Sequence, residues 1–304
     1  MPPTYLTAYD DSGAAMAALR FTQRLARDTG AKVVAAYVYP DVHPLPSPYG
    51  PETLIAKNAD LTAVARETAL GVLEHVPEDV EAFAVAGGSV PHELDRFARQ
   101  EHAALLAVGA THRGGVGRVV PGSVGERVIH GSPCPVLVVP QGHAERPVRR
   151  IAVAYDGREQ SRRALRAASA LAGRLGASLV LIGVTDLPPG EYIPHLPDHE
   201  RDREITQAMR IVLERAASRL LPQGFDISIR LPIGGPAPAI VEACADDVDL
   251  LVAGSHGHGA MRSALVGSVS RYLVDHAPCA VLVVPRHRAI ELVAGDAVST
   301  TTAP

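Results

Sequence analysis

The chain has 304 residues, 47% of them hydrophobic, so it is long enough to bury two ordinary cores. Its net charge of −4 and pI near 6.3 argue against a protein that binds nucleic acid or an anionic membrane through charge. No apolar stretch reaches the roughly 18–20 residues of a membrane span, and no basic-then-apolar segment opens the chain. We therefore expect a cytoplasmic protein, with its three cysteines as buried, inert thiols.

In chain order, short apolar runs alternate with helical patterns. The expected strands of the first half are residues 5–9, 32–39, 80–85, 103–108 and 135–139. The expected helices are residues 12–29, 61–75, 90–100 and 123–130, with a proline-rich loop after the second strand. The second half repeats this order. Strict alternation of strand and helix favours a parallel, doubly wound sheet.

The sequence also contains an internal duplication. Ala-Tyr-Asp at 8–10 recurs at 154–156, and Gly-Gly at 87–88 recurs at 234–235. Pro-Cys-Pro-Val-Leu-Val-Val-Pro at 133–140 recurs as Pro-Cys-Ala-Val-Leu-Val-Val-Pro at 278–285. We therefore expect two copies of one domain, domain 1 (residues 1–143) and domain 2 (residues 148–286), with residues 287–304 as a flexible tail.

A glycine-rich loop in domain 2 is the clearest candidate for a functional site. Gly254, Gly257 and Gly259 remove Cβ atoms after the fourth strand, which lets the backbone approach a ligand. Gly267 and Ser268 then begin a helix, whose amides and positive dipole end suit a phosphate. The alternative is a tight turn that merely needs glycines, with Ser268 as a simple N-cap.

Asp156 ends the first strand of domain 2, next to the strand that Gly254 ends. In a sheet of order 3-2-1-4-5 these two strands are neighbours, and their connections leave in opposite directions, opening a crevice. A carboxylate there can accept hydrogen bonds from a ribose hydroxyl or an adenine amine, so the inferred ligand is a nucleotide. The alternative for Asp156 is a turn or capping role, and Ser161 is available as a helix cap.

Other motifs for nucleotide binding or catalysis are absent from the sequence. No lysine follows a glycine loop as in a Walker A motif, and no dinucleotide fingerprint follows either first strand. Cys/His zinc spacing and a nucleophile elbow are also missing. His256, His258 and Arg262 are interpreted either as phosphate contacts or as solvated side chains of the loop.

Up to about residue 286 the chain resembles the tandem form of the universal stress protein family. The resemblance rests on the aspartate that closes the first strand, on the repeated cysteine-bearing strand, and on the loop Gly-x2-Gly-x9-Gly-Ser at 254–268. It implies two Rossmann-like domains of the adenine nucleotide alpha hydrolase-like type. Each domain would have an α/β fold, with a five-stranded parallel sheet of order 3-2-1-4-5 and helices on both faces.

The resemblance further implies ATP binding in domain 2, with a divalent ion such as Mg²⁺ or Mn²⁺. The implied contacts are Asp156, Val184, Ala253, Gly254, Gly257, Gly267, Ser268, Val269 and Ser270. The matching positions of domain 1 are Asp10, Val38, Gly109, Gly122, Ser123 and Val124. There His112 replaces the glycine at 257 and Gly125 replaces the serine at 270, so we expect weaker binding or none. No residue is assigned a catalytic or metal-ligating role.

Family members assemble through their fifth strands, which implies an intrachain pseudo-dimer through residues 136–139 and 281–284 and leaves a further homodimer open. The expected function is that of a nucleotide-dependent stress-response module with little or no turnover. One alternative is a slow ATPase or autophosphorylating enzyme acting at Ser268. The other is an interaction scaffold that binds no nucleotide.

Overall fold

The computed structural model describes most of the chain. The described residues are 1–41, 51–112, 119–121, 123–186, 198–245, 247–255, 267–286 and 292–294.

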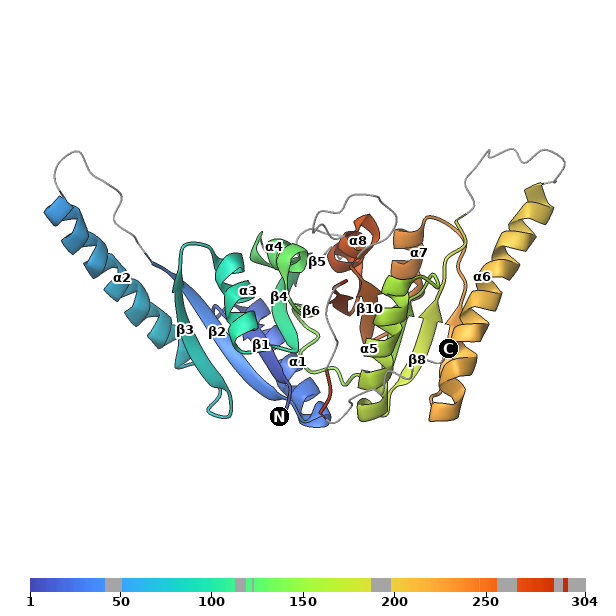
Figure 1. Ribbon diagram of the computed structural model, residues 1–304, viewed down its shortest axis with the longest axis horizontal. Coiled ribbons are helices and arrows are strands. Elements are labelled where there is room, and N and C mark those ends of the chain that lie inside the picture. The colour runs from blue at the N-terminus through green and yellow to red at the C-terminus, as the bar shows by residue number, and fades with distance from the viewer. Residues whose placement is uncertain are drawn as a thin grey trace, which may run out of the picture.

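The strands form one continuous eleven-stranded sheet that runs through both halves (Figure 1). Across domain 1 the order is β3 (Glu81–Gly87), β2 (Lys32–Pro40), β1 (Thr4–Ala8), β4 (Leu105–His112) and β6 (Val136–Pro140). Across domain 2 it is β9 (Ile227–Arg230), β8 (Ser178–Ile182), β7 (Arg150–Ala154), β10 (Leu250–Gly254) and β11 (Ala280–Val284). Within each half these strands are parallel, which confirms the predicted order 3-2-1-4-5.

The two halves join through their fifth strands, as the resemblance implied. β6 and β11 pair antiparallel, with Leu137 opposite Leu282 at the centre of the register. Every residue of β11 is buried, because helices cover both faces of the sheet there. The sequence did not predict β5 (Val119–Pro121), which adds to β4 as an antiparallel neighbour.

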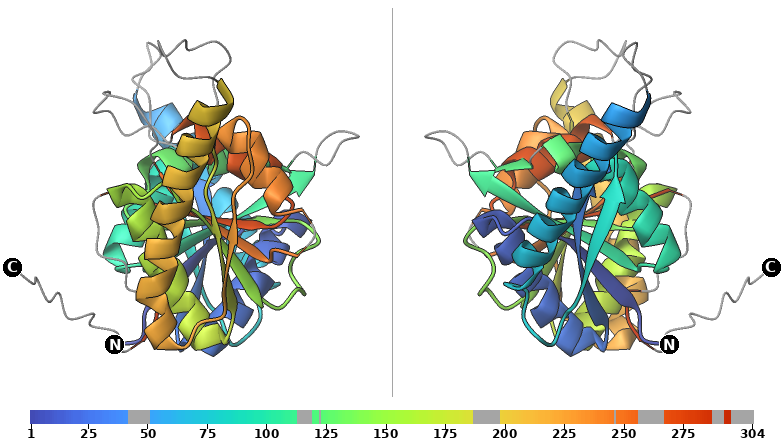
Figure 2. Two further views of the ribbon diagram at one scale, coloured as in Figure 1. Left: turned by 90° about the vertical axis from the view of Figure 1, so that its right-hand side faces the viewer. Right: turned by 90° about the vertical axis from the view of Figure 1, so that its left-hand side faces the viewer.

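Helices cover both faces of the sheet (Figure 2). One face carries α1 (Gly13–Thr29) and α2 (Pro51–Leu73) of domain 1, with α5 (Glu159–Leu175) and α6 (Asp198–Leu220) of domain 2. The other face carries α3 (Val90–Gln100), α4 (Ser123–Gly131), α7 (Pro236–Ala243) and α8 (Ser268–His276). A 3₁₀ turn, η1 (Leu221–Gln223), follows α6. The buried residues of each face form an apolar layer that continues from one half into the other.

Local signals account for the ends of α1. The Ser12 hydroxyl accepts a hydrogen bond from the Ala15 amide at 3.1 Å, and Gly30 closes the helix with a φ of 71°. The prediction fails at α2, which begins at Pro51 rather than near residue 61. Proline is acceptable in the first turn of a helix because the amides there have no intrahelical partner.

A segment beyond domain 2, the C-terminal arm (Leu292–Ala294), packs onto both halves. Leu292 and Val293 are 1% and 5% exposed. The Tyr5 hydroxyl of β1 donates to the Leu292 carbonyl, and the Arg174 guanidinium of α5 donates to the Ala294 carbonyl. The expectation of a flexible tail therefore does not hold for these three residues, because Leu292 and Val293 join an apolar cluster that contains residues of both halves.

Two further expectations concern composition. The thiols of Cys134, Cys244 and Cys279 are buried, and none of them forms a disulfide. Among the described helices, none combines the length and the apolar character that crossing a bilayer requires.

Candidate functional site

The predicted site lies at the edge of the sheet where β7 and β10 end. The two strands are parallel neighbours, with Val153 opposite Val252. Asp156 follows the end of β7 by two residues, and Ser255 follows the end of β10 by one. The chain leaves β7 for α5 on one face of the sheet, whereas α8 lies on the opposite face. The structure thus brings the ends of both strands to the edge where a doubly wound sheet places ligands.

One oxygen of the Asp156 carboxylate is hydrogen-bonded to the turn before α5 and to the first turn of that helix. Oδ1 accepts hydrogen bonds from the Arg158 amide at 3.0 Å and from the Ser161 hydroxyl at 2.7 Å. Among the described residues, Oδ2 is approached only by the Arg158 guanidinium, at 3.9 Å, and 42% of the side chain is exposed. The turn role and an acceptor role are therefore compatible, because they use different oxygens.

Ser161 does not cap α5 as its sequence position suggested. The helix begins at Glu159, and the N-cap position is Arg158, which makes no side-chain capping bond. Ser161 lies inside the first turn, 6% exposed, and its hydroxyl points back to Asp156 and to the Arg158 carbonyl. The sequence named the residue but not its role, which is to orient the carboxylate.

The N-terminus of α8 lies against the end of β10. The Gly267 amide donates to the Ser255 carbonyl at 2.6 Å, and the first intrahelical bond runs from the Arg271 amide to the Gly267 carbonyl at 3.0 Å. The amides of residues 268–270 precede that bond, so they have no intrahelical acceptor. No side chain caps this helix, and Ser268 is exposed. Three amides and the positive end of a helix dipole form a suitable anion site.

Two other predicted residues brace this helix start. Ser270 is 3% exposed, and its hydroxyl donates to the Gly254 carbonyl at 2.6 Å, tying the first turn of α8 to the end of β10. Val269 is partly buried against the apolar layer on that face. Ala253 is 2% exposed within β10, where it pairs with Val283. These three side chains therefore support the local structure, and the backbone amides of 269 and 270 are left for a ligand.

Gly254 has a packing role that the sequence did not reveal. A Cβ at this position would lie 2.9 Å from Cβ of Gln160 and 3.0 Å from its carbonyl carbon and oxygen. The matching glycine of domain 1, Gly109, is still tighter, since its Cβ would lie 2.2 Å from the Ala14 carbonyl oxygen. Each glycine lets the first turn of a helix approach the fourth strand. The expectation that Gly254 also lets the backbone approach a ligand stays a prediction beside this packing role.

Val184 follows β8 at the same edge. The Gly183 amide donates to the carbonyl of Arg230, the last residue of β9, and the Thr185 amide donates to the carbonyl of Pro232, at 3.1 Å each. The backbone groups of Val184 therefore point the other way, toward β7. The Tyr155 amide takes the preceding carbonyl of β8, that of Ile182, and the chain then turns into α5. Val184 therefore presents its amide and carbonyl beside Asp156, with no backbone partner among the described residues.

Domain 1 carries a different arrangement at the matching edge. Oδ1 of Asp10 accepts the Ser12 amide at 3.1 Å. Asp11 takes the left-handed φ of 61° that Gly157 takes at 79° in domain 2. Its carboxylate is bound by the Tyr9 hydroxyl at 3.0 Å and by Nδ1 of His75 at 2.9 Å. Burial, with the contact to Asp11, raises the pKa of Tyr9 to about 12.

The remaining predicted residues of domain 1 are placed as follows. Val38 lies within β2 opposite Val85, Val124 is partly buried, and Ser123 begins α4. His112 ends β4. Several calls lie outside the described residues, namely Gly122 in domain 1 and Gly257, His256, His258 and Arg262 in domain 2.

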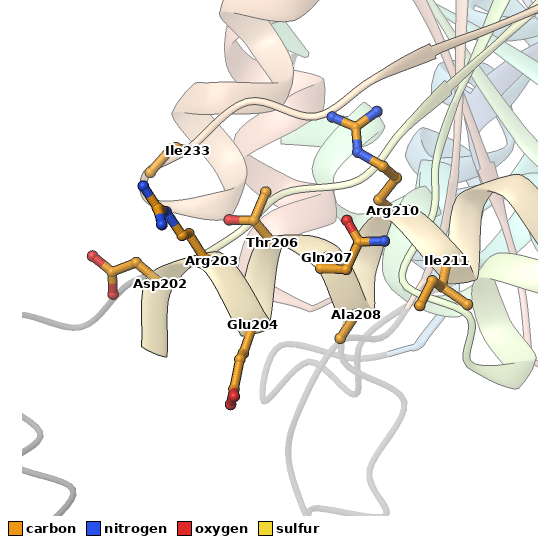
Figure 3. Close-up of a pocket in the computed structure, with 9 residues that line it drawn as sticks. All are labelled: Asp202, Arg203, Glu204, Thr206, Gln207, Ala208, Arg210, Ile211 and Ile233. Carbon is orange, nitrogen blue, oxygen red and sulfur yellow. The ribbon is translucent and has the colours of Figure 1, made fainter. Parts of the chain in front are cut away.

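A hollow of about 870 Å³ lies elsewhere on domain 2, along one side of α6 (Figure 3). Arg203, Gln207 and Arg210 of α6 line it together with Ile233, which follows β9. It shares no lining residue with the edge formed by Asp156 and Ser268. We assign the candidate site to the sheet edge, because open backbone amides and a carboxylate meet there. Among the described residues, no group of three His, Cys, Asp or Glu side chains is arranged to hold a metal ion.

Both halves of the chain are similar to known proteins. The model of the universal stress protein family matches residues 3–140 and again residues 147–285. A universal stress protein of Thermus aquaticus is 32% identical over 135 residues, or 44% of this chain and 96% of that protein. One from Mycobacterium tuberculosis is 30% identical over 216 residues, covering 68% of this chain and 66% of that protein.

A solved structure gives the same fold over nearly the whole chain. A universal stress protein from Archaeoglobus fulgidus aligns with a TM-score of 0.63 at 20% identity, covering 93% of this chain and 98% of its own. A universal stress protein in complex with cAMP aligns over 47% of this chain and 100% of its own, at 26% identity and a TM-score of 0.37.

Proposed function

This chain belongs to the universal stress protein family, and we propose that its second domain binds an adenine nucleotide at the carboxyl edge of β7 and β10. The nucleotide is ATP with a divalent ion such as Mg²⁺ or Mn²⁺. Binding serves as the signal of a cytoplasmic stress-response module, and turnover is slow or absent.

One observation carries this proposal. The amides of residues 268–270 begin directly after the Gly267–Ser255 hydrogen bond, at the same sheet edge as the Asp156 carboxylate. The start of α8 is therefore held close to the end of β10 by a hydrogen bond between two backbone groups. A phosphate chain fits the amides of α8, while a ribose or adenine donor fits the carboxylate.

The residues divide the work by chemistry. The amides of residues 268–270 hold phosphate oxygens, and Oδ2 of Asp156 accepts a hydrogen bond from the nucleoside. The backbone amide and carbonyl of Val184 face β7 and are suited to pair with the edge of an adenine ring. The divalent ion would neutralise phosphate charge while bound mainly by the phosphates themselves and water. Ser161 acts as a positioning residue because it touches Asp156 and not the ligand.

ATP binding also gives a route to a signal. A ligand at about 100 times its dissociation constant adds about 2.7 kcal/mol to the free energy of unfolding of the domain that binds it. In this proposal α8 starts at the ligand, and it lies on the side of domain 2 that faces domain 1 (Figure 1). Nucleotide binding would therefore stabilise a helix next to the interface between the halves.

The test is native mass spectrometry of the purified protein, followed by calorimetric titration with ATP, ADP, AMP and cAMP. We expect one nucleotide per chain, with ATP bound most tightly. No heat with any of the four would contradict the proposal and favour the nucleotide-free scaffold. Tighter binding of cAMP than of ATP would overturn the assignment of α8 to a phosphate chain.

A second candidate function is phosphoryl transfer to Ser268, whose residue is exposed at the start of α8. The serine Oγ would form a bond to the γ-phosphorus while the bond between that phosphorus and the β,γ-bridging oxygen breaks. ADP would leave, and the hydroxyl proton would go to solvent. γ-Labelled ATP checks it: label retained by the protein and lost in Ser268→Ala, with ATP binding preserved, would establish the transfer. Absence of label at saturating ATP would leave binding as the function.

A further inference from the structure

The interface between the halves has a local two-fold pseudo-symmetry. In the antiparallel pairing of β6 with β11, Val136 lies opposite Val283 and Val138 lies opposite Val281. The central pair, Leu137 and Leu282, consists of two equivalent positions of the duplicated sequence. A residue that contacts its own counterpart lies on the axis that relates the two domains. The pseudo-axis therefore passes through the centre of the β6–β11 pair.

A second pair of equivalent residues meets on this axis with opposite charges. Arg271 of α8 and Glu126 of α4 are 145 positions apart, the same spacing as Leu137 and Leu282. The Arg271 guanidinium donates to Glu126 Oε1 at 3.0 Å. Their side chains are 52% and 40% exposed. Figure 1 shows α4 and α8 side by side at the centre of the molecule.

The consequence follows from symmetry. If two copies of domain 2 paired through their fifth strands, each Arg271 would meet another Arg271. If two copies of domain 1 paired in the same way, Glu126 would meet Glu126. Like charges at contact distance repel and oppositely charged ones attract, so only the mixed pairing satisfies both side chains. The sheet contacts cannot make this distinction, because the two fifth strands are nearly identical in sequence.

We infer that Arg271 and Glu126 select domain 1 as the partner of domain 2 at the fifth-strand interface, and disfavour pairing of like domains from separate chains. The selected partner is the other domain of the same chain, which the short linker holds at a high effective concentration. This inference is independent of the nucleotide, since it rests on the interface alone.

Single charge reversals in the full chain reproduce the disfavoured pairings. Glu126→Arg places two arginines on the axis, as in a pair of domains 2, and Arg271→Glu places two glutamates there. The double variant Glu126→Arg/Arg271→Glu restores an ion pair with the charges exchanged. We would measure amide hydrogen exchange in β6 and β11 and thermal unfolding for all four proteins, with the chain count from native mass spectrometry.

A matched control is Lys32→Glu, which removes the 2.7 Å pair between Lys32 and Glu81 far from the interface. We expect each single reversal to lower Tm by about 2 °C and to speed exchange in β6 and β11 about threefold. The double variant should recover most of the loss, but not all of it, because Arg271 also lies 4.0 Å from Asp275 and the exchange of charges does not restore that contact. Lys32→Glu should leave exchange in these strands unchanged. High salt should shrink all differences.

If the double variant had a Tm as low and an exchange as fast as the worse single variant, the inference would be overturned. Opposite charges at these two positions would then not stabilise the interface. Single reversals identical to the wild-type protein in exchange and in Tm would also overturn it. An increase in two-chain species in the single variants, reversed in the double variant, would support it further.

Discussion

The hydroxyl of Ser161 donates a hydrogen bond to Oδ1 of Asp156 at 2.7 Å, from inside the first turn of α5. This bond and the one from the Arg158 amide fix the carboxylate through Oδ1, and Oδ2 lies 3.9 Å from the Arg158 guanidinium. A partly exposed aspartate would otherwise lose rotamer freedom on binding a ligand, at a cost in affinity. Ser161 is therefore expected to influence nucleotide affinity without touching the nucleotide.

Ser161→Ala should raise the dissociation constant for ATP about fivefold, because one hydrogen bond of about 1 kcal/mol no longer orients Asp156. The matched control is Ser169→Ala on the same helix, where the hydroxyl donates only to the Leu165 carbonyl at 2.8 Å. Calorimetric titration of both variants checks the prediction. Equal affinity of the two variants would show that Ser161 has no positioning role.

Gly254→Ala should destabilise the protein even without nucleotide. The added Cβ would lie about 3 Å from the Gln160 backbone, so α5 or β10 must shift, at a cost of about 1–3 kcal/mol. Gly71→Ala is the contrasting control, since nothing lies within 4 Å of its Cβ and alanine favours the helix interior by about 1 kcal/mol.

Urea unfolding of the nucleotide-free protein measures both glycine variants. A stable Gly254→Ala variant with normal unfolding but weakened ATP binding would return this glycine to the ligand role that the sequence suggested.

Leu292→Ala should destabilise the protein by about 2–3 kcal/mol, because the side chain is 1% exposed in the core layer shared by both halves. Leu221→Ala is the matched control, at a leucine 59% exposed, where we expect a change below about 0.5 kcal/mol. Chemical unfolding compares the two. Indistinguishable variants would mean that the C-terminal arm contributes nothing and behaves as a loose tail in solution.

Asp95 of α3 should make the free energy of unfolding fall as pH rises, whereas a salt-bridged aspartate makes it rise. Burial raises the pKa of its carboxyl to about 6, against the partial opposition of Arg99 and His92, and Oδ1 is buried without a hydrogen-bond partner. The folded pKa lies above the unfolded value of about 3.9, so its stabilising contribution is present below about pH 4 and is lost as pH rises through 6.

Asp95→Asn should therefore stabilise the protein at pH 8 relative to wild type and leave it nearly unchanged at pH 4. The exposed Asp28→Asn serves as the control that changes charge without burial. Tm values across pH 4–8 test this, and a variant less stable than wild type at pH 8 would contradict the account of Asp95.

The sequence predicted the parallel, doubly wound sheet and the duplication because alternating apolar runs and repeated motifs are local signals, whereas the strand order was implied by the family resemblance. The C-terminal arm was not predictable in this way. Leu292 and Val293 belong to a short apolar run broken by Glu291, too brief to predict an element, and their partners, such as Tyr5, lie almost 290 positions away. β5 was missed because its three residues form a strand only by pairing with β4.

The sequence predicted where the residues of the candidate site lie, but it did not predict which neighbours their side chains contact. The sequence placed Asp156 and Ser268 after neighbouring strands, and the structure brings both to one edge. It could not say that Gly254 makes room for Gln160, since a missing Cβ looks the same whether a helix or a ligand takes the space. It also offered Ser161 as a cap, because a hydroxyl near a helix start has several acceptors and only coordinates choose among them.

The central claim is that ATP binds at Asp156 and the start of α8, and calorimetric titration of Asp156→Asn against Asp10→Asn tests it most directly. The two aspartates are equivalent in the duplication and both accept an amide two residues on, although Asp156 also accepts the Ser161 hydroxyl. We predict that Asp156→Asn weakens ATP binding about 10- to 100-fold, as expected for losing a charged acceptor, and that Asp10→Asn leaves the affinity unchanged. Unchanged affinity in Asp156→Asn, or a larger loss in Asp10→Asn, would contradict the account.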